Sequence, residues 1–379
     1  METLIPRYFK DPGQSYFLFG PRGTGKSTLL RELWKEALWV DLLEPDIFRS
    51  YSARPERLRE LVLAYPKIKT VIVDEIQKLP ELLPVVHALI EKNKSLQFIL
   101  TGSSARTLKR TGVDLLGGRV LKKTLHPFIA AELKEDFDLE KALEIGLVPL
   151  VVRARDPKSI LQAYAGLYVR EEVQAEGLVR NIGGFSRFLE AVSFSHAAVL
   201  NLSNVARECE IERKVVEGYL SILEDLLLSY RIPVFTKKAK RATIVHSKFF
   251  FFDAGVFRSL RPAGPLDQPQ EIMGAALEGL VAQHLLAWNA YRGDSNRLYY
   301  WRTRSGAEVD FVLYGKDLFW AIEVKNTARI RPEDMTSLKT FQEEYPQSSA
   351  FFLYRGKERL KIHGVLCLPC QEFLREYLK

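Results

Sequence analysis

The most informative segment of this chain reads Gly20-Pro21-Arg22-Gly23-Thr24-Gly25-Lys26-Ser27. It follows the phosphate-loop pattern GxxxxGK[ST], in which glycines let successive backbone N–H groups turn toward phosphate oxygens. The apolar run 16–19 before it predicts a short buried strand, and residues 28–33 after it predict the first turns of a helix. The N-terminus of that helix would add the positive end of its dipole. Strand, loop and helix together predict a nucleotide site.

The side chains of this loop predict how a nucleotide is held. Lys26 can reach the β- and γ-phosphates, and the Ser27 hydroxyl can bind Mg²⁺. We therefore expect ATP or ADP with Mg²⁺ as ligands, and Lys26 as a catalytic as well as a binding residue. The nucleotide-binding residues that we expect are Gly20, Pro21, Arg22, Gly23, Thr24, Gly25, Lys26, Ser27 and Thr28.

A second segment, residues 70–75, is an apolar run that leads directly into two carboxylates. Buried parallel strands of an α/β sheet end in this way at the carboxyl edge, where ligands bind. The segment also has the form of a Walker B motif. Asp74 would hold Mg²⁺, directly or through water, and Glu75 would activate the attacking water as a general base.

A third segment, residues 96–104, predicts another buried strand that ends in small polar residues. Thr101 and Ser103 are candidates to contact the γ-phosphate or to orient the attacking water. The same residue types also serve as turn formers and helix caps, and that alternative stays open. Strands that alternate with helices predict a parallel sheet with right-handed crossovers, over about residues 1–130.

These three segments together resemble a prokaryotic AAA-type ATPase family. In that family the ATPase is joined to a C-terminal domain of uncharacterised function that is related to PD-(D/E)xK nucleases. The resemblance implies a P-loop ATPase core, homo-oligomerisation and a link to DNA. It also implies that an arginine of a neighbouring subunit completes the ATP site. Arg119 is our candidate because residues 116–119 resemble the end of this family's core, with Arg106 and Arg110 as rivals. The alternative for Arg119 is a surface ion pair.

Residues 186–262 predict a winged helix-turn-helix unit. Two short helical patterns, 202–207 and 215–223, precede the basic run 237–241 and an apolar strand at 248–252. The basic run would form the tip of the wing and contact DNA phosphates. Acidic residues in the second helix oppose that interpretation, so a packing module with a solvated wing remains the alternative.

Residues 270–379 follow the order of a PD-(D/E)xK core. A helix carries Glu278, a hairpin strand carries Asp310, and the next strand carries Glu323 and Lys325 on one face. The three carboxylates would bind Mg²⁺ or Mn²⁺, and Lys325 would act in catalysis by orienting water or stabilising negative charge. The proline of the pattern is missing before Asp310. The alternative is a buried salt-bridge group without a metal.

Composition sets outer limits on these predictions. The chain has 379 residues and a net charge of +8, which permits a polyanionic partner but also fits a generic basic surface. A signal peptide and a membrane-spanning apolar run of ~20 residues are not evident, so we expect a cytoplasmic protein without membrane contact. Three cysteines are too few for a disulfide framework, and we expect Cys367 and Cys370 to be structural.

The predicted fold is therefore α/β and has four parts. They are a P-loop ATPase core with a parallel sheet (1–130), a helical connecting or lid region (131–185), a winged-helix-like unit (186–262) and a restriction-endonuclease-like α/β domain (270–379). Two functions fit this order. The first is a Mg²⁺-dependent ATPase that acts on DNA with a metal-dependent nuclease domain. The second is a nucleotide-controlled regulatory switch whose C-terminal domains bind DNA or a protein partner without cleavage.

Overall fold

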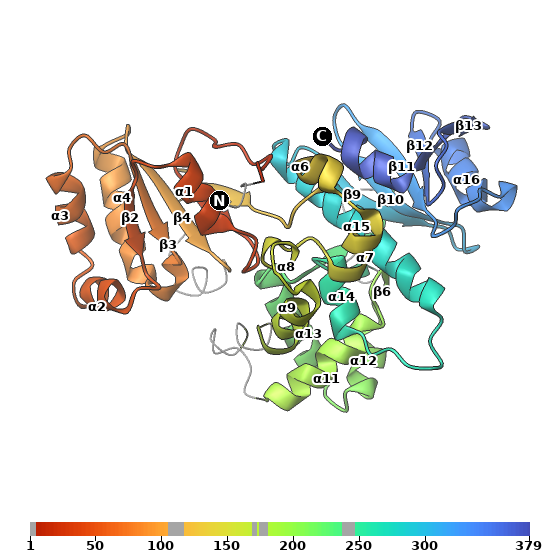
Figure 1. Ribbon diagram of the computed structural model, residues 1–379, viewed down its shortest axis with the longest axis horizontal. Helices are drawn as coiled ribbons and strands as arrows, with labels where there is room; N and C mark the ends of the chain where they lie inside the picture. Colours follow the sequence, from red (N-terminus) through yellow and green to blue (C-terminus); the bar gives the residue numbers. More distant parts are fainter. Residues whose placement is uncertain (1–4, 105–116, 169–172, 174–180, 237–246) are drawn as a thin grey trace. The chain divides into compact units, whose positions relative to one another are not determined.

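The computed structural model describes residues 5–104, 117–168, 173, 181–236 and 247–379. These residues form two compact units (Figure 1). The N-terminal unit contains residues 7–126 and 225–228, and the C-terminal unit contains residues 127–224 and 229–379 with the start of the chain. In the part of the chain that the structure describes, no helix combines the length and the apolar character needed to span a membrane.

In its described residues, the N-terminal unit contains a five-stranded parallel sheet in the order β2-β3-β4-β1-β5. Its strands are β1 (Tyr16–Phe19), β2 (Leu38–Asp41), β3 (Thr70–Asp74), β4 (Gln97–Gly102) and β5 (Leu121–Thr124). Its helices are α1 (Lys26–Leu33), α2 (Pro45–Ala53), α3 (Arg57–Ala64) and α4 (Leu83–Lys92). The prediction of a mixed α/β fold with a parallel sheet is confirmed.

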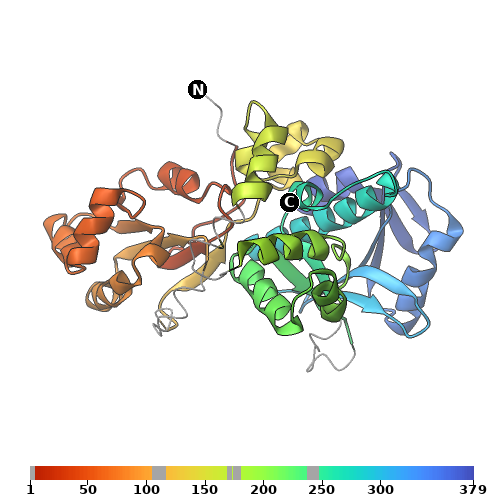
Figure 2. The same cartoon turned by 90° about the horizontal axis from the view of Figure 1, so that it is seen from below.

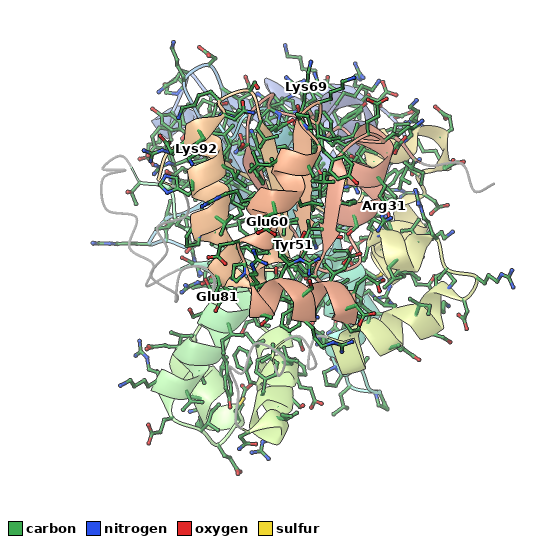
Figure 3. All side chains as sticks on the ribbon, turned by 90° about the vertical axis from the view of Figure 1, so that its left-hand side faces the viewer. Arg31, Tyr51, Glu60, Lys69, Glu81 and Lys92 are labelled. Carbon is green, nitrogen blue, oxygen red and sulfur yellow. The ribbon has the colours of Figure 1, made fainter. Side chains whose placement is uncertain are left out.

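Alternation along the strands builds the core of this unit. Val71 and Val73 are two residues apart on β3, so both point to the same face of the sheet, where they join Phe98 of β4 in one apolar cluster. Helices α2, α3 and α4 contribute to the same cluster through their apolar stripes. Figure 3 marks these helices by the labelled side chains of Tyr51, Glu60 and Lys92.

The first part of the C-terminal unit is mainly helical. Its helices are α6 (Ala130–Leu133), α7 (Leu139–Ile145), α8 (Pro149–Val152), α9 (Pro157–Ala163), α11 (Ile182–Ser193), α12 (Leu202–Glu208), α13 (Arg213–Asp225) and α14 (Ala254–Leu260). A small antiparallel sheet of strands β6 (Ala198–Val199), β7 (Ser229–Ile232) and β8 (Lys248–Phe251) has the order β6-β8-β7. The basic run 237–241 lies outside the described residues.

A six-stranded sheet with the order β13-β14-β12-β11-β10-β9 ends the described part of the chain. Its elements are β9 (Arg297–Arg302), β10 (Glu308–Tyr314), β11 (Phe319–Val324), α16 (Thr336–Glu344), β12 (Ser349–Tyr354), β13 (Leu360–Ile362), β14 (Val365–Pro369) and α17 (Cys370–Glu372). Strands β9, β10 and β11 pair antiparallel, whereas β11, β12 and β14 pair parallel. Cys367 and Cys370 are buried free thiols, and burial raises the pKa of Cys370 to about 12.

Helix α15 (Pro269–Tyr291) lies alongside this sheet, as both Figure 1 and Figure 2 show. Its Trp288 ring stacks on Trp320 of β11, with ring centroids 5.6 Å apart. On another side, a Cβ atom at Gly279 would lie 2.3 Å from Nε2 of His196. Since α15 is contacted on more than one side, its sequence is apolar nearly all round instead of amphipathic.

Candidate functional site

The phosphate loop connects β1 to α1 and depends on two glycines. A Cβ atom at Gly20 would lie 2.4 Å from the carbonyl oxygen of Leu125, so no larger residue fits between the loop and the end of β5. Gly25 has φ of 84° and caps the N-terminus of α1. Side chains rarely adopt that left-handed conformation, which here turns the backbone into the helix.

Lys26 is buried at the start of α1, and its ammonium group donates to the Gly20 carbonyl at 2.8 Å. A buried ammonium exchanges such carbonyl partners for phosphate oxygens at little cost, because phosphate carries charge. Thr24 is also buried, and its hydroxyl donates to the Pro21 carbonyl at 2.7 Å. Both side chains therefore bond to backbone carbonyl groups of the same loop.

Arg7 is a part of this region for which sequence analysis had no signal. Its guanidinium donates to the carbonyl of Thr24 at 3.0 Å and to that of His126 at 2.6 Å. It therefore ties the phosphate loop to the segment that follows β5. The motif pattern does not extend back to residue 7, so only the three-dimensional contact identifies it.

Strand β4 lies between β1 and β3, so its polar end separates the loop from the two carboxylates. Thr101 donates through its hydroxyl to Oδ1 of Asp74, and the same hydroxyl accepts from the backbone N–H of Glu75 at 3.0 Å. Asp74 is only 1% exposed. Thr101 therefore contacts Asp74 from the neighbouring strand, and its predicted role at the γ-phosphate or the attacking water stays a prediction.

Glu75 has φ of 60°, which is rare for a residue with a side chain and turns the chain sharply after β3. Its carboxylate accepts from Nε2 of Gln77 at 2.5 Å. The same amide nitrogen lies 3.2 Å from the Ser103 hydroxyl. Gln77 thus connects the predicted base to the end of β4, and sequence reasoning assigned it no role.

The oxygen donors at this edge fit the group that the motif implies. Magnesium prefers carboxylate and hydroxyl oxygens, which Asp74 and Ser27 would supply. On phosphate binding, the loop between Gly20 and Lys26 would present backbone N–H groups and the Lys26 ammonium to the phosphate oxygens.

Arg119 lies near the end of the N-terminal unit, in an exposed ion pair with Glu91 of α4. Its guanidinium also approaches the Gly117 carbonyl at 3.3 Å. A surface ion pair is the alternative role that the sequence analysis left open for Arg119. Arg106 and Arg110 lie outside the described residues.

The four residues predicted in the C-terminal domain lie near one another. Asp310 on β10 accepts from the backbone N–H of Val324 at 2.9 Å, which places it beside the end of β11. Glu323 is 4% exposed and pairs with Lys325 at 2.6 Å. Its other oxygen, Oε2, is buried and has no hydrogen-bond partner among the described residues.

A further lysine occupies the centre of this group. Lys248 begins β8, and its ammonium lies 2.9 Å from Glu278, 2.6 Å from Glu308 and 3.3 Å from Asp310. Its side chain is only 2% exposed. Within the described residues, no group of three or more His, Cys, Asp or Glu side chains has the arrangement of a metal site. The ion pairs of Lys248 match the salt-bridge alternative, and the metal centre stays a prediction.

The electrostatics of this group reflect burial and mutual charge. Burial alone would lower the pKa of Lys248, but Glu278, Asp310 and Glu308 together raise it well above its ordinary value. Burial and the charge of Asp310 raise the pKa of Glu278 and that of Glu323 above their ordinary values. Glu278 and Glu323 therefore bind protons more readily than ordinary carboxyls, and Lys248 is held in its protonated form.

Comparison with protein families identifies the N-terminal part. Residues 13–134 match the family described as AAA domain. Residues 13–134 therefore resemble an AAA-type P-loop domain. Residues 136–267 and 273–373 match two domains of unknown function, DUF8612 and DUF4143. The ATPase family match spans the loop, the Asp74-Glu75 pair and the end of β4.

Related proteins leave the function open. Two uncharacterized proteins, of Mycobacterium bovis and Mycobacterium tuberculosis, are 24% identical over 368 residues, which cover 94% of this chain and 80% of theirs. Among solved structures, AMPPCP-bound DnaA from Aquifex aeolicus is 14% identical with a TM-score of 0.27, covering 56% of this chain and 81% of that one. Protein VC1899 from Vibrio cholerae is 12% identical with a TM-score of 0.22, covering 90% and 97%. Both TM-scores are low, so the ATPase assignment rests on the family match.

Proposed function

We propose that this chain is a Mg²⁺-dependent ATPase that works as a nucleotide-controlled switch for its C-terminal unit. The observation that carries the proposal is the hydrogen-bonded group at the edge of the parallel sheet. There Thr101 of β4 bonds Asp74, and Gln77 bonds both Glu75 and Ser103. This group faces the same sheet edge as the phosphate loop, because β4 lies between β1 and β3.

Each residue of the ATP site would have its own role in binding or hydrolysis. Lys26 and the loop N–H groups hold the β- and γ-phosphates, and Glu75 takes the proton of the attacking water. Thr101 would fix the carboxylate of Asp74, and Ser103 would contact the γ-phosphate. Magnesium, held by Ser27 and Asp74, would neutralise phosphate charge. Gln77 positions Glu75 without contacting the nucleotide.

For the C-terminal unit, the buried Lys248 favours binding without cleavage over the nuclease that the sequence order suggests. An ammonium among Glu278, Glu308 and Asp310 supports a structural role for these carboxylates. The nuclease remains the second candidate, because Asp310, Glu323 and Lys325 do follow the spacing of the PD-(D/E)xK pattern.

DNA contact through a winged helix is part of the proposal. Helices α12 and α13, which lie in the chain between β6 and the β7–β8 pair of one antiparallel sheet, support it. The acids of α13 count less against phosphate binding than their number suggests, because Glu217 pairs with Arg213 and Glu224 pairs with Arg231.

Alanine substitution of the basic run tests this part of the proposal. Replacing Lys237, Lys238, Lys240 and Arg241 by alanine should weaken DNA binding. The slope of log K against log salt concentration should become shallower by about 0.9 for each phosphate that the variant no longer neutralises. An unchanged slope would remove the wing from the proposal.

Phosphate release from ATP with Mg²⁺ tests the ATPase itself. We expect wild-type turnover, loss of nucleotide binding or turnover in Lys26→Ala, and retained ATP binding with ~10²–10⁴-fold slower hydrolysis in Glu75→Gln. Wild-type turnover in Glu75→Gln would show that another group is the base. Incubation of supercoiled and linear DNA with Mg²⁺ or Mn²⁺, with and without ATP, separates the switch from the nuclease.

A further inference from the structure

The Lys248 ammonium is paired with the carboxylates of three residues. An ammonium has three N–H donors, and the three nearest carboxylate oxygens, from Glu278, Glu308 and Asp310, lie 2.6 to 3.3 Å away. Its nitrogen is also 5.6 Å from the centre of the Tyr300 ring, a second favourable interaction for a cation. The donor capacity of the side chain is therefore used fully inside the protein.

The lysine and its partners come from different parts of the C-terminal unit. Lys248 opens β8 of the small sheet, whereas Glu278 belongs to α15 and Asp310 to β10 of the large sheet. Backbone hydrogen bonds hold the two sheets together nearby. The N–H of Phe235, just beyond β7, donates to the Tyr300 carbonyl at 2.6 Å. The Tyr300 N–H in turn donates to the Pro233 carbonyl at 3.1 Å.

Phe235 also belongs to the apolar core of the large sheet, where its ring packs against Tyr299 and Phe341. The small sheet is thus anchored on the large one by strand pairing and by a buried aromatic ring. Its neighbouring strand then carries Lys248 into the acidic group. Withdrawal of the lysine alone would leave its ammonium or the carboxylates buried without a partner, which is costly.

We propose that the Lys248 ammonium stands where a divalent metal would otherwise bind, so that the group is an ionic lock between the two sheets and is closed to Mg²⁺ and Mn²⁺. A metal bound by Glu278 and Asp310 would lie within a few ångströms of the ammonium, and two cations at that distance in a buried site repel strongly. The inference does not depend on ATP hydrolysis, because metal binding is measured without nucleotide.

Removal of the ammonium is the direct test. Lys248→Met keeps the length of the side chain and removes its charge. We expect nucleotide-free Lys248→Met to bind Mn²⁺ at least about 100-fold more tightly than wild type, as measured by calorimetry and by electron paramagnetic resonance. Mn²⁺ should raise the Tm of the variant and leave that of the wild type unchanged. Addition of Asp310→Asn to Lys248→Met should abolish the new site.

A matched control is Lys158→Met. Lys158 pairs with Glu144 and is 69% exposed, and it makes none of the three ion pairs of Lys248. We expect it to leave Mn²⁺ affinity within a few-fold of wild type. If Lys248→Met does not fold, Lys248→Met with Glu308→Gln removes one positive and one negative charge, keeps Glu278 and Asp310, and carries the same test.

Three results would overturn the proposal. One is wild-type Mn²⁺ binding that equals that of Lys248→Met and disappears in Asp310→Asn. Another is a folded Lys248→Met, or a folded Lys248→Met with Glu308→Gln, that shows no gain in Mn²⁺ affinity. The third is a Lys248→Met with Glu308→Gln variant that stays unfolded even with Mn²⁺, because no cation could then replace the ammonium. Metal-dependent DNA cleavage by wild type that is lost in Asp310→Asn would count as the first result.

Discussion

At the scale of single residues, Gln77 is the least expected member of the ATP site. It bonds both the Glu75 carboxylate and the Ser103 hydroxyl, while Glu75 itself has a left-handed backbone. A strained residue needs support from its surroundings to keep one conformation. The amide of Gln77 supplies part of that support, and Gly102 leaves room for it, since a Cβ there would lie 2.6 Å from Oε1 of Gln77.

We therefore predict that Gln77→Ala lowers kcat for ATP by about tenfold or more, because a general base without its orienting partner contributes less to catalysis. The KM for ATP and the affinity for ADP should change little, since Gln77 does not belong to the phosphate loop. Steady-state kinetics and ADP titration measure both. A large rise in KM with an unchanged kcat would instead assign Gln77 to nucleotide binding.

At the scale of elements, two glycines hold the phosphate loop for different reasons. Gly20 lacks space, with the Leu125 carbonyl 2.4 Å from its would-be Cβ. Gly25 has space, since nothing lies within 4 Å of its would-be Cβ, but it has φ of 84°. Asparagine tolerates the left-handed conformation better than alanine does, so the two sites can be distinguished by one pair of substitutions.

We expect Gly25→Ala to lower the free energy of unfolding by about 1–2 kcal/mol and Gly25→Asn to restore part of it. At Gly20 the order should reverse, with a decrease of about 1–3 kcal/mol in Gly20→Ala and a larger one in Gly20→Asn, because overpacking grows with size. Urea unfolding of the full chain gives these values. Equal behaviour of alanine and asparagine at both positions would contradict the distinction.

At the scale of the whole molecule, buried histidines make stability depend on pH. His284 of α15 accepts from the Ala130 N–H at 2.9 Å through Nε2, and its Nδ1 lies 2.7 Å from the Leu280 carbonyl. A proton on Nε2 would face that N–H. Burial lowers the pKa of His284 to about 4, and it also lowers the pKa of His126 to about 4 and that of His196 to about 3.

The unfolded chain therefore binds protons below the ordinary histidine pKa while the folded chain does not. The contribution to stability is complete above about pH 6.5 and declines as the pH falls toward 4. For His284 alone we expect a decrease of about 2 kcal/mol between pH 7.5 and pH 5. Urea unfolding at both pH values should show that the free energy of unfolding of His284→Gln decreases less than that of wild type, by this amount. An identical decrease in both proteins would refute the assignment.

Assembly is the other property at this scale. If Arg119 completes the ATP site of a neighbouring subunit, Arg119→Ala and Lys26→Ala should each be inactive alone, and their mixture should regain turnover. An arginine that stabilises the transferring phosphoryl is worth ~10³–10⁵ in kcat. Glu91→Gln, which frees Arg119 from its ion pair without removing it, is the matched control and should keep activity. A mixture no more active than Lys26→Ala alone would reject the shared site.

Local sequence determined the strands, the phosphate loop and the order of the polar strand ends. These follow from interactions between residues close in the chain: apolar runs that suit buried parallel strands, and glycines where the backbone must turn. Since Asp74 and Thr101 end neighbouring strands, their proximity could be predicted from the motif order. Glu278, Asp310 and Glu323 could likewise be grouped from the order of their elements.

Tertiary structure alone decided which partner these acids have. Lys248 is separated from Glu278 by 30 positions and from Asp310 by 62, and it belongs to a different sheet. A lysine at the start of a strand has no local feature that predicts burial, because its ordinary place is the solvent. Its charge can enter the interior only where several carboxylates converge, and that convergence exists only once the two sheets have packed. Packing therefore brings a buried lysine to carboxylates that the sequence predicts as metal ligands.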